Sequence, residues 1–153
     1  MRYFSLVLVV LLSACRTTGI NSNTELSPYI GETFPILKRT SLLMIGPSQA
    51  SPSTKIVNHG IEYTVAVDNS DEIIYISTDS PAFHTPEGFS LGSNLEEILA
   101  SGGSEVVYET GWAHYSVLPS GWCAAFYGDL VNNKQLFSPP IGTSKVSYYF
   151  KRK

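Results

Sequence analysis

The chain has little charge and no excess of positive charge. Charged residues make up 15% of its 153 residues, and the formal net charge is −3. Its one basic cluster, Lys151-Arg152-Lys153, stands at the C-terminus. A nucleic-acid-binding domain carries a basic patch or stripe, so nucleic acid is not an expected partner. The triplet is interpreted as a solvated tail, and contact with an anionic lipid or cell-wall polymer is the alternative.

Catalytic and metal-binding motifs are also missing. None of the histidines, His59, His84 and His114, has a second histidine at a spacing such as His-x-x-x-His. They are expected at the surface, and no metal site is expected. Ser120 lies in Pro-Ser-Gly-Trp instead of Gly-x-Ser-x-Gly, and no Gly-x-Gly-x-x-Gly or Walker motif occurs. The sequence therefore predicts no catalytic residue, no cofactor and no enzyme activity.

The longest apolar run stands at the N-terminus and is too short to span a bilayer. Arg2 precedes an apolar segment, Tyr3 to Leu12. As a helix this segment covers about 15 Å, half of a hydrocarbon core of roughly 30 Å. The small residues Ser13 and Ala14 follow, directly before Cys15. This order predicts a secretory signal. A simple signal with an unrelated cysteine, or a buried N-terminal helix, are the alternatives.

The stretch Leu12-Ser13-Ala14-Cys15 resembles the lipobox of bacterial lipoproteins, which are cut before the cysteine and lipidated on its thiol. The resemblance implies a signal peptide over residues 1–14 and a diacylglycerol on Cys15 that anchors the chain in a membrane. In enteric relatives, an Asp directly after the lipidated cysteine retains the lipoprotein in the inner membrane. Arg16 stands at this position here, so the resemblance implies the outer membrane, facing the periplasm. Residues 15–28 are then the lipidated cysteine and a flexible polar tether, and 29–153 form one domain.

Lipidation of Cys15 would leave Cys123 without a disulfide partner in the chain. Cys123 lies in the apolar run 121–126, so a buried and inert thiol is expected. A reactive thiol would need nearby positive charge to lower its pKa.

Short strands separated by turn residues dominate the rest of the chain. β-Branched and aromatic residues alternate over 61–67, and a second run follows a polar turn, which predicts a hairpin. Segment 36–45 is interpreted as a strand, with a short helix as the alternative, and the proline-containing segment 46–54 as a loop. The further strands are expected at 55–57, 72–78, 105–110, 113–118, 122–127 and 146–150.

One short helix is expected at about 94–100. Ser93 begins Ser-Asn-Leu-Glu, which predicts a capping box with Glu96 at the third helical position. The helix is too short to be stable alone and must pack through its apolar face on the sheet. Glu96 and Glu97 are adjacent on this helix and point in different directions, so they are not an acid–base pair. The apolar face consists of Leu95, Ile98 and Leu99.

Residues 73–126 resemble a pattern found in small envelope proteins of uncharacterised families. In that pattern a strand leads to a short acidic helix, a glycine and a β-meander. The connecting motif here is Phe83-x-Thr85-x-x-Gly88-Phe89-x-Leu91-Gly92-Ser93. The resemblance implies no catalytic residue. A weaker similarity is to small outer-membrane assembly lipoproteins, in which two helices precede a three-stranded sheet, whereas here one helix follows strands.

Aromatic residues gather in the second half of the chain. Tyr148, Tyr149 and Phe150 are consecutive, so they cannot all face one side of a strand. Trp112 stands at a predicted turn. These side chains are expected in the core or covering a sheet edge, and exposed anchors for a protein or glycan are the alternative.

The expected fold is α+β: a mostly antiparallel twisted sheet of six to seven strands with one short helix on a face. An all-β sandwich or barrel is the alternative. The expected function is that of a membrane-anchored envelope lipoprotein, a non-enzymatic binding or scaffold module for another envelope protein. An inhibitor or sensor that binds a cell-wall enzyme or a cell-wall fragment is the alternative.

Overall fold

A computed structural model describes residues 30–34, 41–127 and 139–153. In chain order the elements are β1 (Ser41–Gly46), β2 (Gln49–Asn58), β3 (Ile61–Val67), β4 (Ile73–Thr78), α1 (Leu95–Ala100), β5 (Val107–Glu109), β6 (Ala113–Val117), β7 (Cys123–Phe126) and β8 (Tyr148–Arg152). The eight strands form one antiparallel sheet in the order β1-β2-β3-β4-β8-β7-β6-β5. The last strand, β8, therefore joins β1–β4 to β5–β7 by pairing with both β4 and β7.

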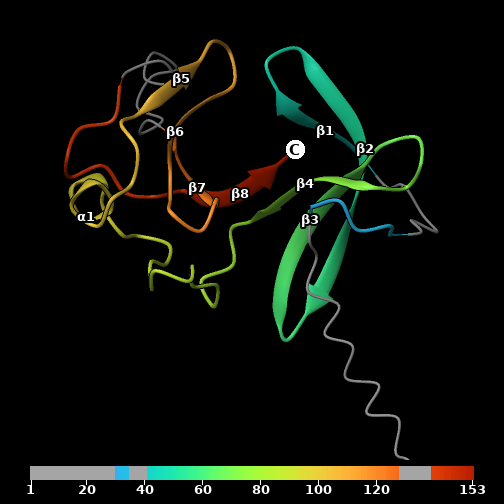
Figure 1. The fold of residues 1–153 in the computed structure, drawn as a ribbon, viewed down its shortest axis with the longest axis horizontal. Helices are drawn as coiled ribbons and strands as arrows, with labels where there is room; N and C mark the ends of the chain where they lie inside the picture. The colour runs from blue at the N-terminus through green and yellow to red at the C-terminus, as the bar shows by residue number, and fades with distance from the viewer. Residues whose placement is uncertain (1–29, 35–40, 128–138) are drawn as a thin grey trace, which may run out of the picture.

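The sheet curls into a half-barrel that opens between its edge strands, β1 and β5 (Figure 1). Side chains alternate along β8, so that Tyr148, Phe150 and Arg152 point to the inside of the curl. Tyr149 and Lys151 point to the outside. We call these two sides the inner face and the outer face. Helix α1 lies on the outer face (Figure 1).

The outer face is closed by α1 and by the connection that leads from β4 to it. Phe83 of this connection packs at centroid distances of 4.7 to 6.2 Å against the rings of Tyr63, Trp122 and Tyr149. Just after α1, a Cβ on Gly103 would lie 2.6 Å from Cγ2 of Ile98 and 2.8 Å from its carbonyl oxygen. Only glycine allows this close approach of the chain to the helix.

The inner face carries an aromatic core. The ring of Phe150 stacks on that of Tyr75 at 5.8 Å and meets the rings of Tyr115 and Trp112 edge-on at 5.2 and 5.0 Å. Small side chains on neighbouring strands leave room for these rings inside the curl. They are Ala66, Ala113 and Ala125.

In the described residues the prediction of a mostly antiparallel sheet with one short helix is confirmed, but the predicted number of strands is too low. Segment 46–54, predicted as a loop, contains a turn and the first half of β2. Pro52 is tolerated there because the β2–β3 pairing reaches only to Ser53, so Pro52 is paired on the β1 side alone. Because the sheet curls, the alternative of an all-β barrel describes the fold better.

The helix is confirmed, but its N-cap lies one residue later in the chain than predicted. Asn94, and not Ser93, is the N-cap: its Oδ1 accepts a hydrogen bond from the N–H of Glu97 at 2.9 Å. The Glu97 carboxylate in turn accepts from the N–H of Asn94 at 3.0 Å. Ser93 Oγ accepts from the N–H of Ser90 instead, at 3.2 Å. Serine and asparagine are equally good N-caps, so residue type alone did not decide between them.

The C-terminal basic triplet is not the solvated tail that the sequence predicts. Lys151 and Arg152 belong to β8. The ammonium of Lys151 lies 5.4 Å from the ring centroid of Trp122, and Lys153 forms an ion pair with Glu72 at 2.6 Å. Arg152 pairs with a carboxylate on the inner face. Each of the three positive charges thus has a partner in the fold. Contact with an anionic lipid or polymer stays a prediction.

Candidate functional site

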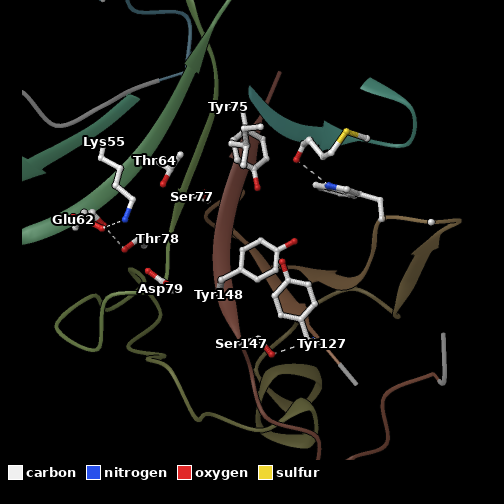
Figure 2. Close-up of a pocket in the computed structure, with 14 residues that line it drawn as sticks. Lys55, Glu62, Thr64, Tyr75, Ser77, Thr78, Asp79, Tyr127, Ser147 and Tyr148 are labelled. Carbon is white, nitrogen blue, oxygen red and sulfur yellow. Dashed lines mark hydrogen bonds and ion pairs between the residues drawn. The ribbon is translucent and has the colours of Figure 1, made fainter. Parts of the chain in front are cut away.

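A cavity of 580 Å³ opens on the inner face, in the curl between β2–β4 and β8 (Figure 2). Its size lies in the range of roughly 300–1,000 Å³ that is typical of small-ligand sites. Its lining includes a polar wall on one side and an aromatic wall on the other (Figure 2). The lining residues are Leu43, Met44, Lys55, Glu62, Thr64, Tyr75, Ser77, Thr78, Asp79, Gly111, Trp112, Tyr127, Ser147 and Tyr148.

The polar wall consists of Lys55, Glu62, Thr64 and Asp79, which Figure 2 shows on one side of the cavity. Lys55 Nζ donates to Glu62 Oε1 at 2.6 Å. This hydrogen bond and the charge of Glu62 raise the pKa of Lys55, and the charge of Asp79 raises it further. The ammonium therefore stays charged at neutral pH.

Strand register places these groups together. The two-residue turn His59-Gly60 has positive φ at both positions, which joins β2 to β3 in a tight hairpin. In that hairpin Lys55 pairs with Thr64, and Glu62 lies two residues earlier on the same face. The hydroxyl of Thr78 donates to the backbone carbonyl of Glu62 at 2.7 Å, which ties β4 to this end of β3.

The aromatic wall consists of Tyr75, Tyr127 and Tyr148, which lie opposite the polar wall (Figure 2). The rings of Tyr127 and Tyr148 stack at 5.0 Å with an interplanar angle of 28°. Tyr127 is 54% exposed, whereas Tyr75 and Tyr148 are buried. Burial raises the pKa of both buried phenols, so they keep their protons and serve as hydrogen-bonding groups.

The edges of the curl are linked beside the cavity by Trp112. Its Nε1–H donates to the carbonyl of Met44 on β1 at 3.2 Å, so the β5–β6 turn contacts the opposite edge strand. The guanidinium of Arg152 lies 4.8 Å from the Trp112 ring centroid. It forms a two-pronged ion pair with Glu109, and one of its nitrogens donates to the Tyr115 hydroxyl at 2.9 Å.

This network has clear electrostatic effects. The hydrogen bond from Arg152 is the main cause of the lowered pKa of Glu109, with a second hydrogen bond from Tyr115. Burial and the Glu109 carboxylate raise the pKa of Tyr115 to about 12. Arg152 and Glu109 stay ionised and hold β8 to the edge strand β5 across the inside of the curl.

The histidines do not gather at the cavity. His59 forms a turn, and His84 is exposed. His114 was expected at the surface, but it is buried on β6, where its ring stacks on Tyr108 at 4.5 Å. Burial lowers the pKa of His114. Within 30–34, 41–127 and 139–153, no group of histidine, cysteine or acidic side chains is arranged to hold a metal.

Cys123 is buried on the inner face, as its apolar surroundings predict. Burial raises the pKa of its thiol to about 11, so the thiol is protonated at neutral pH. Ser120 serves a structural contact. Its N–H and hydroxyl donate to the Glu87 carboxylate at 2.6 and 3.0 Å. Burial opposes ionisation of Glu87, but these hydrogen bonds lower its pKa overall.

Cys15, the predicted lipidation site, and the tether over 15–28 lie outside the described residues. In the part of the chain that is described, no helix is both long enough and apolar enough to cross a membrane.

No family model, no curated protein and no solved structure matches this chain.

Of the cavity residues, the sequence singles out Trp112 and Tyr148 as core or anchor aromatics, but it does not single out the polar wall. The alternation along 61–67 predicts which side chains are buried, but it does not mark the polar ones between them as a site. Glu62 and Thr64 are those intervening residues. For the aromatic wall the signal was weaker, because Tyr75 and Tyr148 meet only through the β4–β8 pairing of distant segments.

Proposed function

We propose that this chain is a bacterial envelope lipoprotein, anchored through lipid on Cys15 to the outer membrane and facing the periplasm. Its domain acts as a non-enzymatic binding module for another envelope component. The lipobox supports the anchor, because lipidated proteins carry a cysteine in this sequence context. One lipid chain gives only marginal membrane binding, and two or more hold a protein firmly.

The cavity of the inner face is the observation that carries the binding role. Lys55 and Glu62 already compensate each other's charge, since they form an ion pair at 2.6 Å. Its buried phenols hold their protons. Groups in these states are suited to recognise a ligand by hydrogen bonds and ring contacts rather than to exchange protons with it.

A sensor or inhibitor role at the cell wall is the second candidate. The size of the cavity favours it, because 580 Å³ accommodates a small ligand or one protruding group better than a broad protein surface. In this case the module would bind a cell-wall fragment or a side chain of a wall enzyme.

Crosslinking from the cavity tests the binding role. A photoreactive phenylalanine analogue is placed at Thr64, on the polar wall, in the full lipidated chain in cells. The matched control carries the analogue at Leu99, which is 41% exposed on α1. We expect a discrete crosslinked product from position 64 alone. No product, or the same products from both positions, would contradict the proposal.

The anchor is tested separately with Cys15→Ser. The variant is expected in the soluble fraction, whereas the wild-type chain stays with membranes after a carbonate wash. Retention of the variant in washed membranes would show that the cysteine is not the anchor.

A further inference from the structure

We propose that the cavity of the inner face binds a neutral saccharide. This inference rests on the proposed function, because it assigns a ligand class to the same cavity. A pyranose ring has an apolar C–H face and a rim of hydroxyl groups. The cavity offers the matching pair of surfaces: the aromatic wall on one side and the polar wall on the other (Figure 2).

Tyr127 provides the surface for the apolar face of the sugar. Tyr127 is 54% exposed, and the ring of Tyr148 holds its ring in place by stacking on it at 5.0 Å. Tyrosine combines a flat apolar ring with a polar tip, and its ring is positioned with little loss of side-chain entropy. A sugar that covers Tyr127 gains dispersion contacts and C–H contacts to the ring without requiring the wall to rearrange.

The polar wall provides partners for the sugar hydroxyls. Lys55 donates, Glu62 and Asp79 accept, and the Thr64 hydroxyl does both. An apolar ligand would strip water from these groups without replacing it, which disfavours such a ligand. A hydroxyl-rich ligand replaces the lost water at each of them.

Charge favours a neutral saccharide over an acidic one. The ammonium of Lys55 is compensated by Glu62, to which it is bound at 2.6 Å. Asp79 then leaves this wall with an excess of negative charge. A carboxylated or phosphorylated sugar would be repelled at short range.

The experiment uses the full lipidated chain in a detergent without a sugar headgroup. A neutral tetramer of N-acetylglucosamine and an acidic tetramer of galacturonate are titrated calorimetrically. The neutral tetramer is expected to bind with a Kd on the order of 1 mM or below. Tyr127→Ala should weaken this binding at least about tenfold, which is the effect of losing one ring contact of ~1.4 kcal/mol. Tyr108→Ala is the matched control, because Tyr108 is 47% exposed but lies outside the cavity.

Tryptophan emission gives a second readout from within the cavity. The chain has two tryptophans, and Trp112 lines the cavity whereas Trp122 packs on the outer face. In a Trp122→Phe background, the neutral tetramer should therefore still change the emission. Circular dichroism of each variant confirms that it is folded before its titration is interpreted.

Three results would overturn the inference: no heat and no emission change up to about 10 mM neutral tetramer, equal binding by Tyr127→Ala, or tighter binding of the acidic tetramer. If crosslinking from Thr64 still gives its product in any of these cases, the binding module stands and the ligand class is wrong. If both experiments fail, the binding role of the cavity fails with them.

Discussion

The outer and inner faces of the half-barrel differ in how their apolar side chains are covered. On the outer face, α1 and the β4–α1 connection cover an aliphatic and aromatic core, and the approach at Gly103 leaves no space for a single extra carbon. On the inner face, no element of the described residues covers the sheet. Aromatic rings, an Arg152–Glu109 ion pair and a hydrogen bond from Trp112 fill one part of the curl, and a cavity occupies the other.

This difference separates stability from recognition. A core that is filled on one side gives the sheet the rigidity it needs to hold an open site on the other. Residues of the outer face should therefore affect folding alone. Residues of the inner face should divide into those that hold the curl, such as Arg152, and those that meet a ligand, such as Tyr127.

The largest effect should come from the outer face, at Ile98. Its side chain is fully buried, whereas the adjacent Leu99 on the same helix is 41% exposed. Ile98→Ala should lower the free energy of unfolding by about 2–5 kcal/mol through lost burial and a cavity. Alanine is a better helix former than isoleucine, so the loss cannot come from helix propensity.

Leu99→Ala is the matched control and should cost well under half as much as the Ile98 substitution. Urea titration followed by circular dichroism measures both. Equal costs for the two variants would show that α1 does not pack tightly on the outer face.

A smaller effect is expected on the inner face, from Glu109→Gln. The side chains of Glu109 and Arg152 are 19% and 29% exposed, so this ion pair is neither fully buried nor freely solvated. We expect a loss of about 1–3 kcal/mol, because Arg152 keeps its charge and loses its partner. The exposed Glu105 serves as control, and Glu105→Gln should change little.

The pH dependence of this pair follows from the lowered pKa of Glu109 in the folded state. Between that pKa and the ordinary value of 4.5, the unfolded chain binds more protons than the folded one. The stability difference between wild type and Glu109→Gln should therefore be constant above pH about 5 and shrink as pH falls through the folded pKa. Unfolding titrations from neutral to acidic pH measure it. A constant difference at every pH would show that the ion pair does not hold the curl.

The faces also differ in how far the sequence predicts them. The alternation over 61–67 predicts β3 and its hairpin partner correctly, because local pattern and turn chemistry agree there. Half of β2 was missed, since Pro52 indicates a loop unless the pairing on each side of it is known. The cavity was missed for a related reason. Its two walls meet through the β4–β8 pairing, which joins distant segments and has no local signal.

The smallest effect on stability is expected at the N-cap of α1, where the sequence offers two neighbouring residues as candidates. Asn94 accepts the capping hydrogen bond from Glu97, whereas Ser93 bonds within the preceding turn. Asn94→Ala should cost about 1 kcal/mol, the usual loss for an N-cap. Ser93→Ala removes a partly buried contact outside the helix and should cost less. Urea titration compares the two variants.

Since α1 covers only the outer face, saccharide titration of Asn94→Ala should match wild type. A larger loss of stability from Ser93→Ala than from Asn94→Ala would show that Ser93 is the N-cap. Weaker saccharide binding by Asn94→Ala than by wild type would show that the two faces are coupled.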